Sequence, residues 1–439
     1  MPRAAHDDRV RLAPPDTVVE IARVLTDAGF ETWCVGGAVR DALLGESHLD
    51  WDLATAAKPA EVRRLFRRTV PVGIDFGTVG VLDTQNVMHE VTTFRRDVKT
   101  DGRHAVVEFG ASLDEDLSRR DFTINAMAYD PLGGEFRDPF HGRQDLATRL
   151  VRAVGDPDAR MREDRLRALR AIRFASRFGF EIEPRTWRAV ADSAPYMTRL
   201  SPERVKQEIE KTMQQVRYAG RAMRLWRESG ALAVLIPALA DVSDVALESL
   251  NLLPPPRDDG KPDREMQRIV ALVADLGPRD AEQALRHLRF PNKTIAWVGS
   301  VLRGWAVIRD DVRRALSERN GPTDAALRRW AGRTGRTRAR AVWRLGAVRW
   351  AAERELGRPA PEANAVASAY RRAMRIAFRD PVEIGDLAVD GDDLLSAGVP
   401  AGPGIKTVLE RLLDDVLEDP ARNTRDALLA RVASLSGRS

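Results

Sequence analysis

The chain has 439 residues, 44% of them hydrophobic, and its 70 Lys and Arg against 65 Asp and Glu give a net charge of +5, so length and composition suit two to four domains with real cores. The single cysteine, Cys34, excludes an intrachain disulfide and a cysteine-rich zinc site, which fits a reducing cytoplasm. The first residues lack the apolar run of a signal peptide and no apolar run is long enough to span a bilayer, so we expect a soluble, cytoplasmic protein without a membrane partner.

Apolar spacing in the first 150 residues alternates between helical and strand patterns. The predicted elements are a helix over 16–28 that ends at Gly29, a strand over 31–35, a turn at Gly36-Gly37, a helix over 39–44, a strand around 51–54, a helix over 59–67, and β-rich runs over 77–83 and 87–94. This order predicts a mixed α/β first domain. From residue 160 onward the pattern is almost only helical, with proline-rich breaks at 254–256, 359–361 and 400–403.

The turn Gly36-Gly37-Ala38-Val39-Arg40-Asp41 joins a predicted strand to a predicted helix. Two glycines allow backbone N–H groups to approach a phosphate, and Arg40 adds a cation. A plain tight turn explains the two glycines equally well. The turn indicates phosphate binding only in combination with neighbouring features.

Three acidic residues lie on the next β-rich runs. Asp50 and Asp52 are two residues apart, so on a strand both carboxylates share one face, and Glu90 lies on a run that could pair beside them. Clustered carboxylates repel one another unless a cation neutralises them, and oxygen ligands favour Mg²⁺. Three such acids below a phosphate-binding turn are the parts of a two-metal nucleotidyl transfer site. Solvated acids on an edge strand are the alternative.

The segment Arg119-Arg120-Asp121-Phe122-Thr123-Ile124-Asn125-Ala126 adds two cations for a triphosphate and polar side chains for a ribose. Asp121 could also simply cap a helix. Further along, Glu163-Asp164-x-x-Arg167 places Asp164 and Arg167 three residues apart, hence on one face of a helix.

Together these motifs resemble those of the class II tRNA nucleotidyltransferases, the CCA-adding enzymes and the related bacterial poly(A) polymerases. The resemblance covers about residues 15–435 with the motifs in the family's order. It implies an α/β nucleotidyltransferase head with a polymerase-β-like mixed sheet, followed by an all-α neck, body and tail. The corresponding ranges are 1–150, 151–229, 230–375 and 376–439.

The resemblance also implies a role for each motif residue. Asp50 and Asp52 would hold Mg²⁺, and Glu90 would support them. Nucleotide contacts would come from Gly36, Gly37, Arg40, Arg119, Arg120, Asp121 and Asn125. The substrates would be CTP, ATP and tRNA; no protein partner is implied.

Asp164 and Arg167 suit a stereochemical selection of the base. Cytosine and adenine both present an amine donor beside a ring-nitrogen acceptor, whereas uracil and guanine present the reverse. A carboxylate and a guanidinium therefore match C and A together, which is the role that the resemblance implies. A surface ion pair is the ordinary alternative. Glu163 and the pair Arg204 and Glu208, four residues apart after the helix start Ser201-Pro202, are expected to support this site without touching the nucleotide.

Several features separate relatives within the family. The stretch Val72-Gly73-Ile74-Asp75-Phe76-Gly77-Thr78-Val79 differs from the Gly-Arg-Arg-Phe type segment of poly(A) polymerases. A polar loop over 96–104 resembles the loop that CC-only enzymes lack. Only His287 lies beyond residue 141, so the body lacks an HD phosphohydrolase site. CC-only or A-only addition, poly(A) synthesis, a small-molecule nucleotidyltransferase and a non-catalytic RNA-binding relative remain alternatives to full CCA addition.

The net charge is concentrated in one stretch. Of the 70 cations 63 are arginine, a bias that by itself indicates nothing about partners, but residues 301–360 hold 15 arginines against six acids, a net charge of +9. Tryptophans 305, 330, 343 and 350 interleave with these arginines and suit a core or a stacking platform. We expect the stretch to bind tRNA phosphates, with its densest part at Arg333, Arg336, Arg338 and Arg340. A solvated helix face is the alternative.

Overall fold

The computed structural model describes residues 11–46, 50–100, 105–255 and 263–436. The chain forms two compact units: Met1–Glu208 with Glu228–Leu235, and Ile209–Arg227 with Ile236–Ser439. The predicted boundaries at residues 150, 229 and 375 stay predictions. None of the helices in the described ranges is long and apolar enough to cross a membrane.

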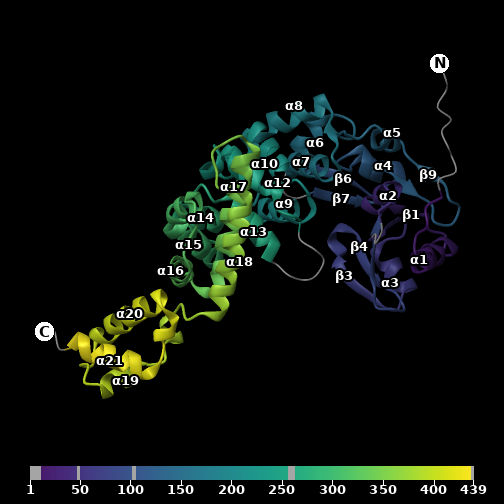
Figure 1. Ribbon diagram of the computed structural model, residues 1–439. Coiled ribbons are helices and arrows are strands. Elements are labelled where there is room, and N and C mark those ends of the chain that lie inside the picture. The colour runs from purple at the N-terminus through teal and green to yellow at the C-terminus, as the bar shows by residue number, and fades with distance from the viewer. Residues whose placement is uncertain (1–10, 47–49, 101–104, 256–262, 437–439) are drawn as a thin grey trace. The chain divides into compact units, whose positions relative to one another are not determined.

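A seven-stranded mixed sheet in the order β3-β4-β5-β2-β1-β8-β9 forms the centre of the first unit (Figure 1). Its strands are β1 (Thr32–Val35), β2 (Asp52–Thr55), β3 (Thr69–Gly73), β4 (Thr78–Leu82), β5 (Met88–Thr93), β8 (Ala128–Tyr129) and β9 (Phe136–Arg137). Only β2 and β5 run parallel, with Leu53 opposite Val91; the other neighbours are antiparallel. This register brings Asp52 and Glu90 to the same edge of the sheet.

Helices cover both faces of this sheet. They are α1 (Asp16–Asp27), α2 (Gly37–Leu43), α3 (Pro59–Leu65) and α4 (Leu113–Ser118), whereas α5 (Gly142–Ala147) packs on the 3₁₀ turn over 123–125. Successive strand residues point to opposite faces. Cys34 and Leu53 pack with α1 and α3, whereas their neighbours Val35 and Ala54 pack with α4. Burial on both faces explains why β1 and β2 show no alternation of apolar and polar residues.

The polar loop predicted over 96–104 is wrong in its first part, because β6 (Arg95–Thr100) pairs with β7 (Ala105–Phe109) in an antiparallel hairpin; residues 101–104 lie outside the described ranges. Arg96 stands opposite Glu108, and their side chains form an ion pair at 2.8 Å. Cross-strand pairs of opposite charge stabilise a hairpin that has no apolar alternation. The loop was predicted from the density of charged residues, which does not exclude a strand.

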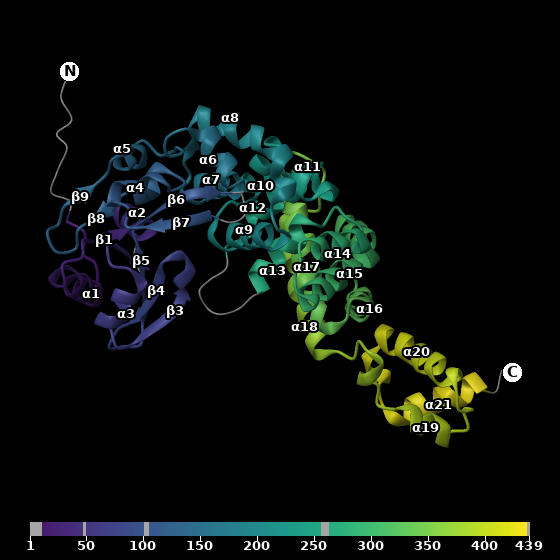
Figure 2. The same ribbon diagram turned by 180° about the vertical axis from the view of Figure 1, so that it is seen from behind.

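The remainder of the first unit is mostly helical. Its elements are α6 (Pro157–Glu163), α7 (Leu166–Phe178), α8 (Pro184–Ser193), the first residues of α9 (Pro202–Gln215), α11 (Ala231–Leu235), the 3₁₀ turns η1 (Ile74–Phe76), η2 (Thr123–Asn125) and η3 (Ala194–Arg199), and the short strands β10 (Leu150–Val151) and β11 (Glu181–Ile182). Figure 2 shows α6, α7 and α8 side by side. The short strand β11, which pairs with β10, is the one strand among the described residues after 160, where the sequence predicted an almost only helical pattern.

The second unit is all-helical over its described residues, as predicted. Its helices are α10 (Ala219–Glu228), α12 (Asp244–Leu252), α13 (Asp263–Leu272), α14 (Pro278–His287), α15 (Asn292–Ser317), α16 (Asp324–Thr334), α17 (Arg336–Glu355), α18 (Ala363–Arg379), α19 (Gly391–Ser396), α20 (Pro403–Glu418) and α21 (Arg425–Ser436), with η4 (Pro237–Leu239), η5 (Ile384–Asp386) and η6 (Pro420–Arg422). The last three helices share a small core of their own around Leu394, Leu412 and Val416.

The four tryptophans of the arginine-rich stretch are core residues. Trp305, Trp330, Trp343 and Trp350 are only 2–8% exposed. Trp305 packs edge-on against Trp350 at 5.5 Å between ring centroids, and Trp330 packs against Trp343 at 6.2 Å. The stacking-platform alternative is therefore wrong for all four.

Candidate nucleotide-binding site

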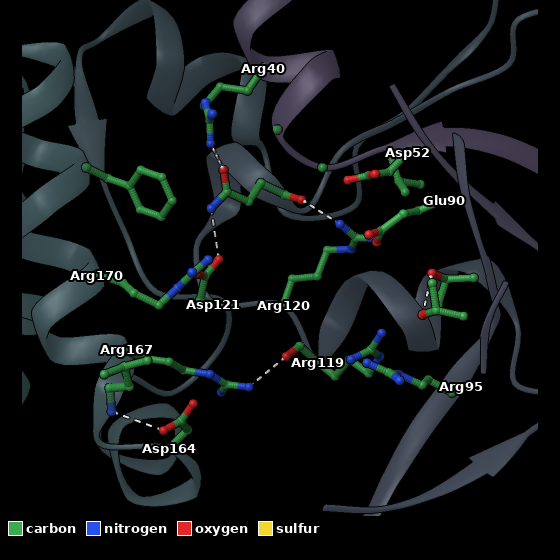
Figure 3. Close-up of a pocket in the computed structure, with 18 of the residues that line it drawn as sticks. Arg40, Asp52, Glu90, Arg95, Arg119, Arg120, Asp121, Asp164, Arg167 and Arg170 are labelled. Carbon is green, nitrogen blue, oxygen red and sulfur yellow. Dashed lines mark hydrogen bonds and ion pairs between the residues drawn. The ribbon is translucent and has the colours of Figure 1, made fainter. Parts of the chain in front are cut away.

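An open cavity of about 570 Å³ lies within the first unit, against the edge of the sheet where β2 and β5 present their acids (Figure 3). Its ionisable lining is unusually cationic, with seven arginines against four carboxylates: Arg40, Arg95, Arg119, Arg120, Arg167, Arg170 and Arg204, and Asp52, Glu90, Asp121 and Asp164. Such a lining favours a polyanionic ligand, and the volume suits a nucleotide.

The predicted glycine turn borders this cavity. Gly36 has φ +75°, and a Cβ there would lie 3.0 Å from Arg120 Nη1, so the position suits glycine for both backbone and space. Arg40, four residues later, is buried: its Nε donates to Asp41 Oδ1 at 2.6 Å, and its Nη1 donates to Asn125 Oδ1. The guanidinium is thus held rigidly at the cavity wall.

Two of the three predicted acids meet at the cavity. Asp52 begins β2, and Figure 3 shows its carboxylate beside that of Glu90. Burial raises the pKa of Asp52 to about 7, with further contributions from the charges of Glu90 and Asp50. Asp50 itself is exposed, precedes β2 and is not among the residues that line the cavity. Within the described ranges no group of three or more His, Cys, Asp or Glu side chains is placed to hold a metal ion.

Arg119 and Arg120 depend on an acid that the sequence analysis did not single out. Asp116 of α4 is 1% exposed; Arg119 Nη2 donates to its Oδ1 at 2.9 Å and Arg120 Nη2 to its Oδ2 at 3.2 Å. Burial would raise the pKa of Asp116, but the two arginines outweigh burial and lower it. The spacing of three and four residues was the available signal. Asp116 fixes both cations at the cavity.

Asp121 and Asn125 form a second network. Asp121 Oδ1 accepts from Asn125 Nδ2 at 2.9 Å, and Oδ2 accepts from Arg170 Nε at 2.7 Å. Burial would raise the pKa of Asp121, but the charge of Arg170 and the Asn125 amide hold it below its usual range. Arg170, 49 residues away in the chain, was missed because no local pattern connects it with Asp121.

The predicted pairing of Asp164 with Arg167 on one helix face is wrong. Asp164 is extended, with φ −148°, and lies between α6 and α7 rather than within a helix. Its Oδ1 caps Leu166 N at 3.0 Å, and its Oδ2 accepts from Arg204 Nη2 at 2.7 Å. Arg167 instead pairs with Glu163 at 2.7 Å and donates to the Arg119 carbonyl at 2.9 Å. Both side chains nonetheless line the cavity.

The supporting residues are also rearranged. Glu208 is buried and accepts from Arg173 Nε at 2.8 Å, which joins α9 to α7. Arg204, expected only to support the site, lines the cavity itself and holds Asp164. Glu163 bonds both Arg160 and Arg167, at 2.7 Å each. Arg204 thus lies at the cavity surface as well as beside Asp164.

The four arginines expected to bind RNA differ in their surroundings. Arg336 is bound to Asp386 at 2.6 Å, and Arg338 Nε donates to Ser300 Oγ at 2.8 Å. Arg333 is exposed, 3.7 Å from Asp311, and Arg340 is exposed with its guanidinium 5.9 Å from the Phe378 ring centroid. Arg336 and Arg338 are therefore tied to neighbouring side chains, whereas Arg333 and Arg340 are exposed to solvent.

Three family models match the chain: "Poly A polymerase head domain" over residues 32–152, "Probable RNA and SrmB-binding site of polymerase A" over 179–242, and a tRNA nucleotidyltransferase domain 2 over 261–432. A curated relative, the CCA-adding enzyme of Geobacillus stearothermophilus, is 35% identical over 429 residues, 95% of this chain and 97% of the relative.

Solved structures of similar proteins cover the chain almost completely. The Bacillus stearothermophilus CCA-adding enzyme in complex with CTP matches with a TM-score of 0.73 and 32% identity, over 97% of this chain and 98% of that one. The Thermotoga maritima CCA-adding enzyme complexed with tRNA shares the fold, with a TM-score of 0.67 and 21% identity over 99% of each chain.

Proposed function

This chain belongs to the CCA-adding enzyme family of tRNA nucleotidyltransferases, and we propose that it adds C, C and A to the 3′ end of tRNA from CTP and ATP. The observation that carries the proposal is the cavity of the first unit. It joins an acid pair, an excess of arginines and a carboxylate–guanidinium set suited to C and A within one volume of nucleotide size.

The triphosphate would lie against the glycine turn and the arginines. Arg119 and Arg120 are held by Asp116, so they need little reorganisation when an anion arrives. Arg40 is fixed at the wall through Asn125, and Asn125 with Asp121 would face the ribose. Cations that are already in position stabilise the negative charge that develops on the pyrophosphate as it leaves.

The acids would hold Mg²⁺. Asp50 and Asp52 are the proposed ligands and Glu90 the supporting acid. The carboxylates of Asp52 and Glu90 line the cavity, and a cation would relieve the burial and like charge that raise the pKa of Asp52. When bound, Mg²⁺ lowers the pKa of the attacking hydroxyl and neutralises phosphate charge. The tRNA 3′ oxygen forms a bond to the α-phosphorus, the bond to the β-phosphate oxygen breaks, and pyrophosphate leaves.

Base selection would rest on Asp164 and Arg167, with Arg204 as a third member. The carboxylate of Asp164 accepts from the exocyclic amine of C or A, while Arg167 donates to the ring nitrogen. Arg204 holds Asp164 at 2.7 Å and Glu163 holds Arg167 at 2.7 Å, so each selecting group has its own anchor. Two independent anchors define a donor–acceptor pattern more firmly than one mutual ion pair.

Incorporation assays test the proposal against its rivals. Transcripts ending before CCA, after C and after CC are incubated with Mg²⁺ and one labelled nucleotide at a time. Full CCA addition predicts C onto the first two and A onto the third; a CC-only or A-only enzyme fails on part of the series, and a poly(A) polymerase extends with A throughout. Asp52→Asn should abolish transfer and keep tRNA binding. No incorporation by the wild type would refute the proposal.

A further inference from the structure

An exposed tyrosine lies beside the site with one ring face covered by an arginine. Tyr196, in η3, is 50% exposed. The Arg165 guanidinium carbon lies 4.8 Å from its ring centroid, and Arg165 Nη1 donates to Ser193 Oγ at 3.2 Å. The hydrogen bond fixes the guanidinium against the ring. Because η3 and the start of α7 both support it, Tyr196 is a rigid aromatic surface open to solvent.

The surroundings of this ring are cationic. Burial lowers the pKa of Arg165, and the charges of Arg199 and Arg162 lower it further. Arg162 is 63% exposed with its one acid, Asp156, at 3.9 Å, and Arg199 is exposed. Among the described residues no acid forms an ion pair with Arg165 or Arg199. Asp192, which precedes η3 by two residues, is exposed and forms no ion pair with Arg165 or Arg199.

The backbone connects this surface to the nucleotide cavity. Arg165 lies between Asp164 and Leu166, and both of these line the cavity. A strand whose 3′ end lies in the cavity and whose preceding nucleotides follow this backbone connection would meet Tyr196. An aromatic face with adjacent cations is the usual platform for unpaired nucleotides, since every base has a π-face and every linkage a phosphate.

We propose that Arg162, Arg165, Tyr196 and Arg199, the Tyr196 patch, bind the unpaired nucleotides that precede the reacting 3′ end of tRNA. One base stacks on the open face of Tyr196, and the arginines contact the flanking phosphates. The inference rests on the proposed function, because it takes the polymer in the cavity to be tRNA. It adds a primer site distinct from the groups that hold the incoming nucleotide.

Two RNA hairpins test the stacking: an acceptor-stem hairpin with three unpaired 3′ nucleotides, and the same hairpin with a blunt end. Binding is measured by fluorescence anisotropy. Tyr196→Ala should weaken binding of the first hairpin about tenfold, and Tyr196→Phe should restore it, because stacking needs only the ring. The blunt hairpin should bind all three proteins alike. An equal loss on both hairpins, or no loss on either, would overturn the inference.

Charge and kinetics provide the second test. Arg199→Met should lower the slope of log Kd against log salt by about 0.7, the value for one phosphate of a single strand. The matched control is Arg23→Met, an exposed arginine on α1, which should change nothing. Tyr196→Ala should raise the KM for RNA about tenfold, by the same stacking loss, with kcat and the KM for CTP unchanged. A raised KM for CTP would place the patch in the nucleotide site and refute the inference.

These outcomes separate the inference from the proposed function. A wild-type protein that adds C and A but whose Tyr196→Ala variant binds overhang RNA normally refutes the patch alone. A wild-type protein that binds neither hairpin and adds nothing refutes both.

Discussion

Arg204 donates to Asp164 at 2.7 Å across 40 residues of sequence, and this bond replaces the local pairing of Asp164 with Arg167. The two residues belong to α9 and to the link between α6 and α7, so the carboxylate that we propose selects the base is oriented by tertiary structure rather than by its own helix. Its geometry follows from how two distant segments of the first unit pack.

Arg204→Ala should disorder Asp164 and weaken use of both CTP and ATP. A hydrogen bond to a charged group is worth about 1.5–3 kcal/mol, so kcat/KM should fall by about 10- to 150-fold for each nucleotide. Arg204→Lys should recover part of this loss. The control is Arg188→Ala, an exposed arginine on α8. Unchanged steady-state kinetics in Arg204→Ala would show that Asp164 needs no anchor.

Arg167→Ala should keep transfer but relax the choice of base. Its guanidinium is the donor that uracil and guanine cannot use, and one good base contact discriminates by about 1–3 kcal/mol. Incorporation of UTP and GTP relative to CTP should therefore rise by about 5- to 150-fold in competition assays with labelled nucleotides. A variant that rejects UTP and GTP as strictly as the wild type would remove Arg167 from base selection.

The raised pKa of Asp52 predicts a pH-dependent stability of the metal-free protein. An unfolded aspartate ionises near pH about 3.9, whereas folded Asp52 ionises at about 7. Between these values the folded state binds the extra proton, so stability falls as pH rises through this window and then levels off. Asp52→Asn should remove this pH dependence, and above pH 7 the free energy of unfolding of the variant should exceed that of the wild type.

Urea unfolding in EDTA at several pH values measures this difference. Subtracting the variant from the wild type isolates Asp52 from the other carboxyls, and Glu20→Gln, an exposed acid on α1, serves as the control. In the wild type, Mg²⁺ should bind more tightly as pH rises through about 7, because the metal displaces that proton. A wild type and an Asp52→Asn variant with parallel pH profiles would contradict the shift.

Local periodicity was sufficient for some elements and insufficient for others. The apolar spacing of Val18, Ile21, Ala22 and Leu25 predicted α1 correctly, because these residues are the buried face. The hairpin β6–β7 was missed, since its pairing depends on backbone bonds from the charged strand β6 to β7. Asp116 and Arg170 were missed for different reasons: the first has a helical spacing that was not weighed, and the second meets Asp121 only through tertiary packing.

Arg268 is predicted to be essential to the stability of the second unit. It is fully buried and donates to the carbonyls of Met213, Val216, Arg217 and Leu253 at 2.6–2.8 Å. Burial lowers its pKa to about 10, so it stays charged at neutral pH. Arg268→Met leaves these buried carbonyls without a donor and should cost at least about 3 kcal/mol. Denaturant unfolding checks this against Arg309→Met, an exposed arginine on α15; equal stabilities would contradict it.

The arginines near the start of α17 should separate into structural and RNA-binding groups. Arg333 and Arg340 are exposed. Arg333→Ala and Arg340→Ala should therefore each weaken tRNA binding and reduce the slope of log Kd against log salt by about the value for one phosphate contact. Neither change should alter the unfolding midpoint. Arg336 ties α17 to η5 through Asp386, and Arg336→Ala should lower the midpoint instead. Filter binding at several salt concentrations and thermal unfolding distinguish the two groups. If Arg333→Ala and Arg340→Ala left the salt slope unchanged, the +9 stretch would be a solvated helix surface and not an RNA contact.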